Sequence, residues 1–277
     1  MAGADHHHPL IFTFGILGNI ISILMFLAPM PTFIRVYKKK STEGFHSIPY
    51  LVGLFSCMLW IYYAMLKSEE YLLLSINSVG CLVEIIYIIC YILYAPKKPK
   101  ILALQLLFLM NFCGFLAIVA LTTFFAKGSI RIHIVGWFCV VVSAVLFAAP
   151  LSVIRVVIRT KSVQFMPLAL SICLTLSAIM WLLYGLLQKD LYIALPNIFG
   201  IIFGAMQLVL YGIYRDKKKI VKEENVAEKA EEMNKAHTVV SVLPICNGNI
   251  NKVHKEENSD EDTNGNGELP IDEVTLV

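Results

Sequence analysis

Charged residues are scarce in this chain, and acidic residues are nearly missing from its first 214 positions. Only 16% of the 277 residues are charged, whereas soluble domains carry about 25%. Residues 1–214 hold 14 Lys and Arg but 6 Asp and Glu, and residues 215–277 hold 9 and 14. Because 57% of the residues are hydrophobic, we expect a body embedded in a bilayer, followed by a solvated acidic tail.

Short motifs of enzymes and of ATP-driven proteins are also lacking. The sequence has no Walker-type loop, no HExxH and no GxSxG. Six of its seven cysteines lie in apolar runs without paired spacing, where cysteine acts as a small hydrophobic residue. The first residues, MAGADHHHPL, have neither a basic region nor a cleavage site, which predicts a retained first helix. We therefore expect no catalysis, no metal site, no cofactor and no disulfides.

Long apolar runs occur seven times. Each has about the 20 residues that a helix needs to cross ~30 Å of hydrocarbon. The expected spans are residues 10–34, 48–66, 71–94, 101–125, 134–158, 167–187 and 191–214.

Basic residues predict the orientation of these spans. The connections on one side, together with the tail, contain 4, 3, 3 and 9 Lys and Arg, and those on the other side contain 0, 1, 2 and 1. Since cytoplasmic connections are enriched in Lys and Arg, the N-terminal residues 1–9 are expected outside. The tail, residues 215–277, is expected in the cytoplasm and disordered. Ser259 lies in an acidic stretch that suits an acidophilic kinase, but a plain solvated spacer is the favoured interpretation of the tail.

An internal repeat relates the first three spans to the last three. The first and fifth spans superpose at a shift of 121 residues, and after one residue of slippage the third and seventh coincide as well. Residues 10–95 and 134–214 thus form two three-helix units, and the single linker helix at 101–125 makes them parallel. The coinciding residues include Gly15 and Gly136, Ala28-Pro29 and Ala149-Pro150, Trp60 and Trp181, and Asn77 and Asn197.

Three sets of repeat-related polar, aromatic and proline residues are candidates for function. Serine and tryptophan four residues apart share a helix face, which suits a sugar ring stacked on an indole. An asparagine amide offers a donor and an acceptor to a polyhydroxyl ligand, and paired prolines mark hinges. The sets are Ser56 with Trp60 and Ser177 with Trp181; Asn77 and Asn197; and Pro29, Pro49, Pro150 and Pro167.

Glu84 is the acidic residue deepest within a span. An intramembrane carboxylate is a candidate for proton relay. The equivalent position in the second unit is Gly204, so a structural role for a protonated or hydrogen-bonded Glu84 stays equally open.

The sequence resembles the plant SWEET sugar facilitators over residues 10–214. The resemblance rests on stretches such as FGILGNIISILMFLAPMPTF, INSVGCLVEIIYIICYILYAPKK and LPNIFGIIFGAMQLVLY. It implies an all-α integral membrane protein of seven helices in a 3+1+3 arrangement, and bidirectional sugar uniport without an energy source. Pro-Gln pairs, typical of the related PQ-loop proteins, are replaced here by Pro49-Tyr50 and Pro167-Leu168.

The resemblance also implies residue roles. Asn77, Asn197, Trp60 and Trp181 take pocket positions, the four prolines form the inner gate, and Tyr63 with Asp190 forms the outer gate. Substrate size is associated with Met25, Ser56, Leu146 and Ser177. The two serines resemble the sucrose-exporting branch, although Val is expected in place of Met25 and Leu146.

Together with the resemblance, these features predict a uniporter of sucrose, and also of glucose or other hexoses, in the plasma membrane or an internal membrane. The resemblance further implies homo-oligomers. Two other functions stay open. One is a proton-coupled sugar symporter that uses Glu84, and the other is a seven-helix receptor, against which the repeat and the short connections argue.

Overall fold

The structure, a computed structural model, describes residues 7–67, 70–146, 148–163 and 166–215. Apart from Arg215, the predicted tail with Ser259 lies outside these residues, as does most of the predicted N-terminal segment. Seven segments of the described chain are long and apolar enough to cross a membrane. They run over Pro9–Lys39, Ile48–Leu66, Tyr71–Tyr94, Lys97–Phe125, Ser129–Thr160, Leu168–Leu187 and Leu191–Tyr214. The prediction of seven spans is confirmed.

The first and fifth spans are each described in two helical segments. The first consists of α1 (His7–Leu27) and α2 (Met30–Lys39), and the fifth of α7 (Ser129–Leu146) and α8 (Ala148–Thr160). Pro29 lies in the turn between α1 and α2, where its missing N–H and its ring disfavour a continuous helix. The repeat-related Pro150 lies in the first turn of α8. Beyond them, Lys40 and Lys161 follow α2 and α8 with left-handed φ values of 53° and 54°.

The remaining spans of the two units are single helices. They are α3 (Ile48–Leu66) and α4 (Tyr71–Tyr94) in the first unit, and α9 (Leu168–Leu187) and α10 (Leu191–Tyr214) in the second. Pro49 lies in the first turn of α3, and Pro167 is the residue before α9. Proline is favoured at helix starts, since its fixed φ suits the first turn and no donor is needed there. Asp190 immediately precedes the seventh span, and its carboxylate caps α10.

The linker span contains a π-helix. It consists of α5 (Lys97–Leu106), the π-helix η1 (Leu107–Gly114) and α6 (Phe115–Phe125). Within η1, the amide of the buried Asn111 donates to the backbone oxygen of Leu51 on α3. The linker is therefore fastened to the first unit near its middle.

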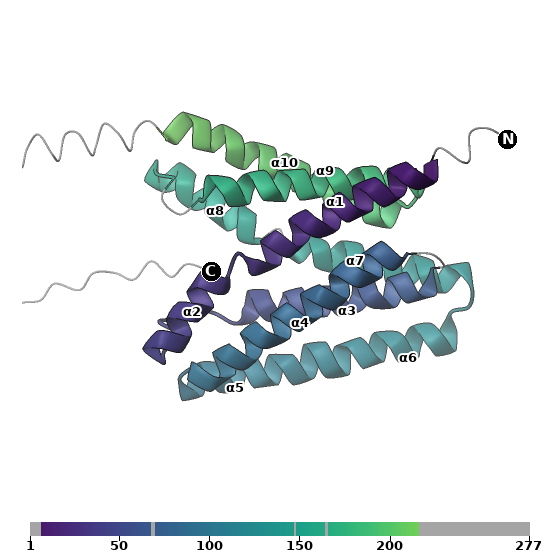
Figure 1. The fold of residues 1–277 in the computed structure, drawn as a ribbon. Helices are drawn as coiled ribbons and strands as arrows, with labels where there is room; N and C mark the ends of the chain where they lie inside the picture. The colour runs from purple at the N-terminus through teal and green to yellow at the C-terminus, as the bar shows by residue number, and fades with distance from the viewer. Residues whose placement is uncertain (1–6, 68–69, 147, 164–165, 216–277) are drawn as a thin grey trace, which may run out of the picture. The chain divides into compact units, whose positions relative to one another are not determined.

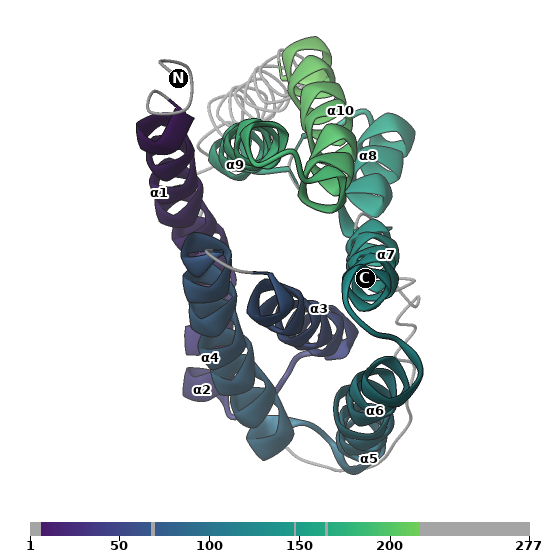
Figure 2. The ribbon, with the colours of Figure 1, turned by 90° about the vertical axis from the view of Figure 1, so that its right-hand side faces the viewer.

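The two units have the same internal arrangement, and they meet through equivalent helices (Figure 2). In the first unit α4 packs against α1 and α3, and in the second α10 packs against α7 and α9. Between the units, α1 contacts α9 and α3 contacts α7. This gives the predicted 3+1+3 architecture, in which the helices run roughly alongside one another (Figure 1).

Candidate functional site

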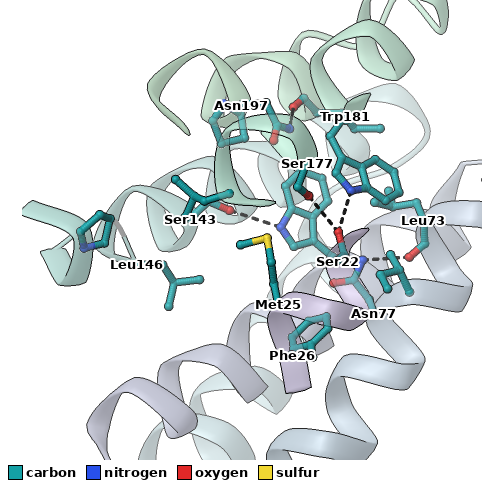
Figure 3. Close-up of a pocket in the computed structure, with 16 residues that line it drawn as sticks. Ser22, Met25, Phe26, Leu73, Asn77, Ser143, Leu146, Ser177, Trp181 and Asn197 are labelled. Carbon is teal, nitrogen blue, oxygen red and sulfur yellow. Dashed lines mark hydrogen bonds between the residues drawn. The ribbon is translucent and has the colours of Figure 1, made fainter. Parts of the chain in front are cut away.

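A cavity of about 400 Å³ lies between the two units. This volume is in the range of small-molecule sites, about 300–1,000 Å³. Both units contribute to it, as the labelled side chains in Figure 3 show. It is lined by Ser22, Met25, Phe26, Trp60, Leu73, Ile76, Asn77, Ser143, Leu146, Pro150, Leu174, Ser177, Trp181, Ile193, Pro196 and Asn197.

The two asparagines enter this cavity from equivalent helices, α4 and α10. The amide nitrogen of Asn77 donates to the backbone oxygen of Leu73 at 2.8 Å, and that of Asn197 donates to Ile193 at 2.7 Å. Each bond uses one of the two amide hydrogens and leaves the amide oxygen as an acceptor. Pro196 precedes Asn197 and also lines the cavity; having no N–H, it leaves the backbone oxygen of Tyr192 without its helical donor.

The two tryptophans are held by serines of the opposite unit. The Trp181 indole nitrogen donates to the Ser22 hydroxyl at 3.1 Å, and the Trp60 indole nitrogen donates to the Ser143 hydroxyl at 3.3 Å. Ser143 follows Ser22 by 121 residues, so the two bonds are repeat-related. Each indole is fixed across the interface between the units, with α1 facing α9 and α7 facing α3.

The surroundings of the two indoles are not identical. Gly18 on α1 lies against Trp181, since a Cβ there would stand 3.1 Å from the indole, whereas the equivalent residue of α7 is Cys139. Ser22 also shares a 3.0 Å hydrogen bond with Ser177. The Trp181 side of the cavity is accordingly the more tightly packed one.

Of the four residues that the sequence associates with substrate size, three line the cavity and one is buried outside it. Met25, Leu146 and Ser177 line the cavity, together with Pro150 from the proline set. Ser56 is buried one turn before Trp60 on α3 but is not part of the lining. Pro29, Pro49 and Pro167 lie at helix ends outside the lining.

Tyr63 and Asp190 meet at the predicted extracellular end of the bundle. The Tyr63 hydroxyl donates to Asp190 Oδ2 at 2.7 Å, and the Lys67 ammonium pairs with the same oxygen. The other oxygen, Oδ1, accepts from the backbone nitrogens of Tyr192 and Ile193 at 2.9 and 3.3 Å. Asp190 is 4% exposed, so this contact joins the two units in a region with little water.

A second cavity, of about 460 Å³, reaches the same contact from the flank of α7 and α10. Tyr63, Lys67 and Asp190 line it, together with His133 and Tyr192.

Glu84 does not line the central cavity. Its carboxylate lies against α3, where a Cβ on Gly53 would stand 2.7 Å from Oε1, and Oε2 is buried without a hydrogen-bond partner. Within the described residues, no group of three His, Cys, Asp or Glu side chains is placed to hold a metal ion.

Comparison with known proteins gives the family. The model of the family described as "Sugar efflux transporter for intercellular exchange" matches twice, over residues 12–99 and 133–219. The chain belongs to the SWEET family. The two matches fall on the two three-helix units, and together they extend over more than half of the sequence.

Individual SWEET proteins are similar over most of the chain. The bidirectional sugar transporter SWEET14 of Arabidopsis thaliana is 57% identical over 210 residues, covering 76% of this chain and 75% of that protein. SWEET15 of Oryza sativa subsp. japonica is 55% identical over 216 residues, or 78% of this chain and 68% of the relative. A 3.7 Å structure of a eukaryotic SWEET transporter superposes with a TM-score of 0.73 at 37% identity, covering 76% of this chain and 99% of that chain.

Sequence reasoning missed two polar residues of the SWEET cavity, Ser22 and Ser143. A lone serine in an apolar run has no periodic signal. The 121-residue shift does relate them, however, and applying it to every polar residue within the spans would have found the pair.

Proposed function

We propose that this chain is a bidirectional, energy-independent sugar uniporter that carries sucrose, and also glucose or other hexoses, by alternating access. The observation that carries the proposal is the symmetry of the central cavity. Each unit supplies one asparagine and one tryptophan at equivalent positions. A site shared by two units can be exposed to one side and then the other as the units move against each other.

The chemistry of the lining suits a neutral sugar. The indole faces of Trp60 and Trp181 offer apolar surface to the C–H face of a pyranose ring, and the two asparagine amides are hydrogen-bonding partners for its hydroxyls. No charged side chain is among the lining residues of the central cavity, so a neutral ligand enters without leaving a buried charge unpaired.

Sucrose is proposed as the main substrate because small side chains leave room beside the indoles. Ser177 contributes this room in the second unit, and Met25 and Leu146 are the bulkier lining residues associated with substrate size. The Ser56 side chain lies outside the lining, and so its influence on substrate size would act through packing around Trp60.

Gating is proposed at both ends of the bundle. The hydrogen bond between Tyr63 and Asp190 supports an outer gate at these two residues. Pro29 lies between α1 and α2, Pro150 lies in the first turn of α8, and Pro49 and Pro167 lie at the starts of α3 and α9. We place the inner hinges at these four prolines.

We further propose that the protein lies in the plasma membrane, with its N-terminus outside and its tail in the cytoplasm. The split of 19 against 4 basic residues between the two sides supports this orientation. We expect homo-oligomers in the lipid bilayer, in which each chain has its own pathway.

Flux of labelled sucrose and of labelled glucose into vesicles containing the purified protein tests the proposal. Both sugars should equilibrate without a pH gradient, and Asn77→Ala and Asn197→Ala should each reduce the flux by at least tenfold, since each loses a direct contact to the sugar. Asn111→Ala is the matched control, because this buried asparagine bonds the linker to α3 outside the cavity.

Other outcomes identify the competing functions. Undiminished flux in both pocket variants would contradict the site. Glucose flux without sucrose flux would overturn the substrate. Sugar flux that collapses when the pH gradient is removed, and that is lost in Glu84→Gln, would instead favour the proton-coupled symporter. Absence of any sugar flux would favour the seven-helix receptor.

A further inference from the structure

A second tyrosine–carboxylate bond lies beside the Tyr63–Asp190 contact. The Tyr184 hydroxyl donates to Glu70 Oε2 at 2.7 Å, the same length as the bond from Tyr63 to Asp190. Tyr184 is on α9 in the second unit, and Glu70 immediately precedes α4 in the first. This bond therefore also crosses between the units, but with donor and acceptor exchanged.

The two bonds are related by the internal repeat. Tyr184 follows Tyr63 by 121 residues, and Asp190 follows Glu70 by 120, the same slippage that relates Asn77 to Asn197. Each carboxylate stands just before the third span of its unit, at the N-terminus of α4 or α10. Duplication of one ancestral tyrosine and one acidic residue thus produces a reciprocal pair of contacts.

Both bonds lie in a protected environment. Tyr63 and Tyr184 are each 1% exposed, and Glu70 and Asp190 are each 4% exposed. A buried carboxylate is costly unless it is paired and hydrogen-bonded. Each carboxylate has partners within its own unit, Lys67 for Glu70 and the backbone of α10 for Asp190, but each accepts a tyrosine hydroxyl only while the two units are in contact at this end.

Lys67 connects the two bonds. Its ammonium lies 3.1 Å from Glu70 Oε1 and also pairs with Asp190 Oδ2. The position equivalent to Lys67 in the second unit is Gln188, whose amide is 3.5 Å from the Tyr184 hydroxyl. The Lys67 ammonium therefore pairs with both carboxylates, so the two tyrosine–carboxylate bonds belong to a single cluster.

Each tyrosine also contacts a tryptophan of the cavity. The rings of Trp60 and Tyr63 are edge-to-face with centroids 5.6 Å apart, and those of Trp181 and Tyr184 with centroids 5.3 Å apart. Tyr184 thus has the same relation to Trp181 as Tyr63 has to Trp60.

We propose that Glu70 and Tyr184 form a second half of the extracellular gate, and that Lys67 joins the two halves. The inference rests on the proposed transport function and deepens it. Opening the outer end separates the units and breaks both tyrosine–carboxylate bonds together with the Lys67–Asp190 pair. The Lys67–Glu70 pair lies within the first unit and stays.

Access to the cavity from outside tests this gate. A reporter cysteine replaces Leu73, which lines the cavity, and intact cells are treated with a membrane-impermeant maleimide. The labelling rate is taken relative to the same variant without the reporter, which removes the contribution of native cysteines. Loss of one hydrogen bond to a charged group should raise this rate about tenfold in Tyr184→Phe, comparable to Tyr63→Phe.

Two further variants sharpen the experiment. Glu70→Gln keeps an acceptor for Tyr184 but removes the charge that faces Lys67, so it should raise labelling by a smaller factor. Tyr87→Phe is the matched control, because the Tyr87 hydroxyl donates to the backbone oxygen of Phe26 within the first unit. Its labelling should equal that of the parent.

Wild-type labelling in Tyr184→Phe and Glu70→Gln, with faster labelling in Tyr63→Phe, would overturn the second half of the gate. Wild-type labelling in all three would overturn the gate as a whole. Sugar flux is measured on the same cells, so faster labelling without sugar flux would contradict the transport function and leave the double contact standing.

Discussion

The indole nitrogen of Trp181 donates to the hydroxyl of Ser22 across the interface between the two units. The repeat-related bond joins Trp60 to Ser143. The candidate stacking surfaces are therefore positioned by the unit to which they do not belong. Any movement of one unit against the other acts directly on the orientation of both indoles.

Removing these serines should weaken sugar binding more than it slows transport of bound sugar. Ser22→Ala leaves the buried Trp181 N–H and the Ser177 hydroxyl without their partner, so we expect KM to rise roughly tenfold. Ser143→Ala should have the smaller effect, because its bond is the longer one, 3.3 Å against 3.1 Å. Concentration-dependent flux of labelled sugar measures both.

Ser78→Ala is the control for this pair. Ser78 is exposed and its hydroxyl bonds the backbone oxygen of Leu74 on its own helix. Equal KM values in all three variants would show that the serines do not position the indoles.

Substitutions at Met25 and Leu146 should change the choice of sugar. Valine at either position removes volume from the cavity wall, and the ratio of sucrose to glucose flux should rise by roughly tenfold or less. Leu24→Val is the matched control, since Leu24 precedes Met25 but its side chain is exposed and lies outside the lining. A ratio that is the same in Met25→Val, Leu146→Val and the control would refute a size limit at these positions.

A methyl group at Gly185 should destabilise the connection that holds Asp190. A Cβ there would stand 2.8 Å from the backbone nitrogen of Ala194 and 3.2 Å from the backbone oxygen of Asp190. Because backbone atoms cannot turn away, Gly185→Ala should cost about 1–3 kcal/mol of unfolding free energy. Thermal unfolding in detergent measures the loss, and Gly212→Ala, with no atom within 4 Å of the added Cβ, should be neutral or slightly stabilising.

The contribution of Lys67 to the stability of the Tyr63–Asp190 contact should not change with pH in the physiological range. Burial alone would lower the Lys67 pKa, but the hydrogen bond and charge of Asp190, with those of Glu70, raise the pKa above its usual value. A raised pKa means that the stabilisation is complete below the usual lysine value, about 10.4, and is lost only as the pH rises through the shifted one.

Thermal unfolding of the wild type should therefore show no loss due to Lys67 from about pH 6 to pH 8, and a decline above about pH 10. Lys67→Gln should lack that alkaline component. A Lys67-dependent loss of stability between pH 6 and pH 8 would contradict the charge pairing described here.

The spans were predictable because a helix that crosses the hydrocarbon core needs about 20 apolar residues, and such runs are visible in the sequence. The ends of the spans were harder to predict. The expected first span stopped at residue 34, before Arg35, whereas the helical segment continues to Lys39, since a helix can pass from hydrocarbon into the polar interface. The π-helix at Leu107–Gly114 had no signal either, because no proline or paired breaker marks that stretch.

The lining residues of the cavity could be predicted from the sequence where the repeat places the same residue type at both equivalent positions. Asn77 with Asn197 and Trp60 with Trp181 are of this kind, and both pairs line the cavity. Ser56 and Ser177 are also a pair, yet only Ser177 reaches the lining. Helical spacing gives the face of a residue but not the packing of its neighbours, so the asymmetry between the two serines was beyond the sequence.

The two carboxylate oxygens of Asp190 have different partners. Oδ1 caps the first turn of α10, and Oδ2 receives Tyr63 and Lys67. In the proposed opening the Asp190 carboxylate would keep the two backbone partners of Oδ1, so Oδ2 would stay directed toward the position that the Tyr63 hydroxyl occupies in this structure. In the proposed gate, the N-terminus of α10 would hold Asp190 in one orientation in both the open and the closed state. Closing would then need no reorientation of the carboxylate that accepts from Tyr63.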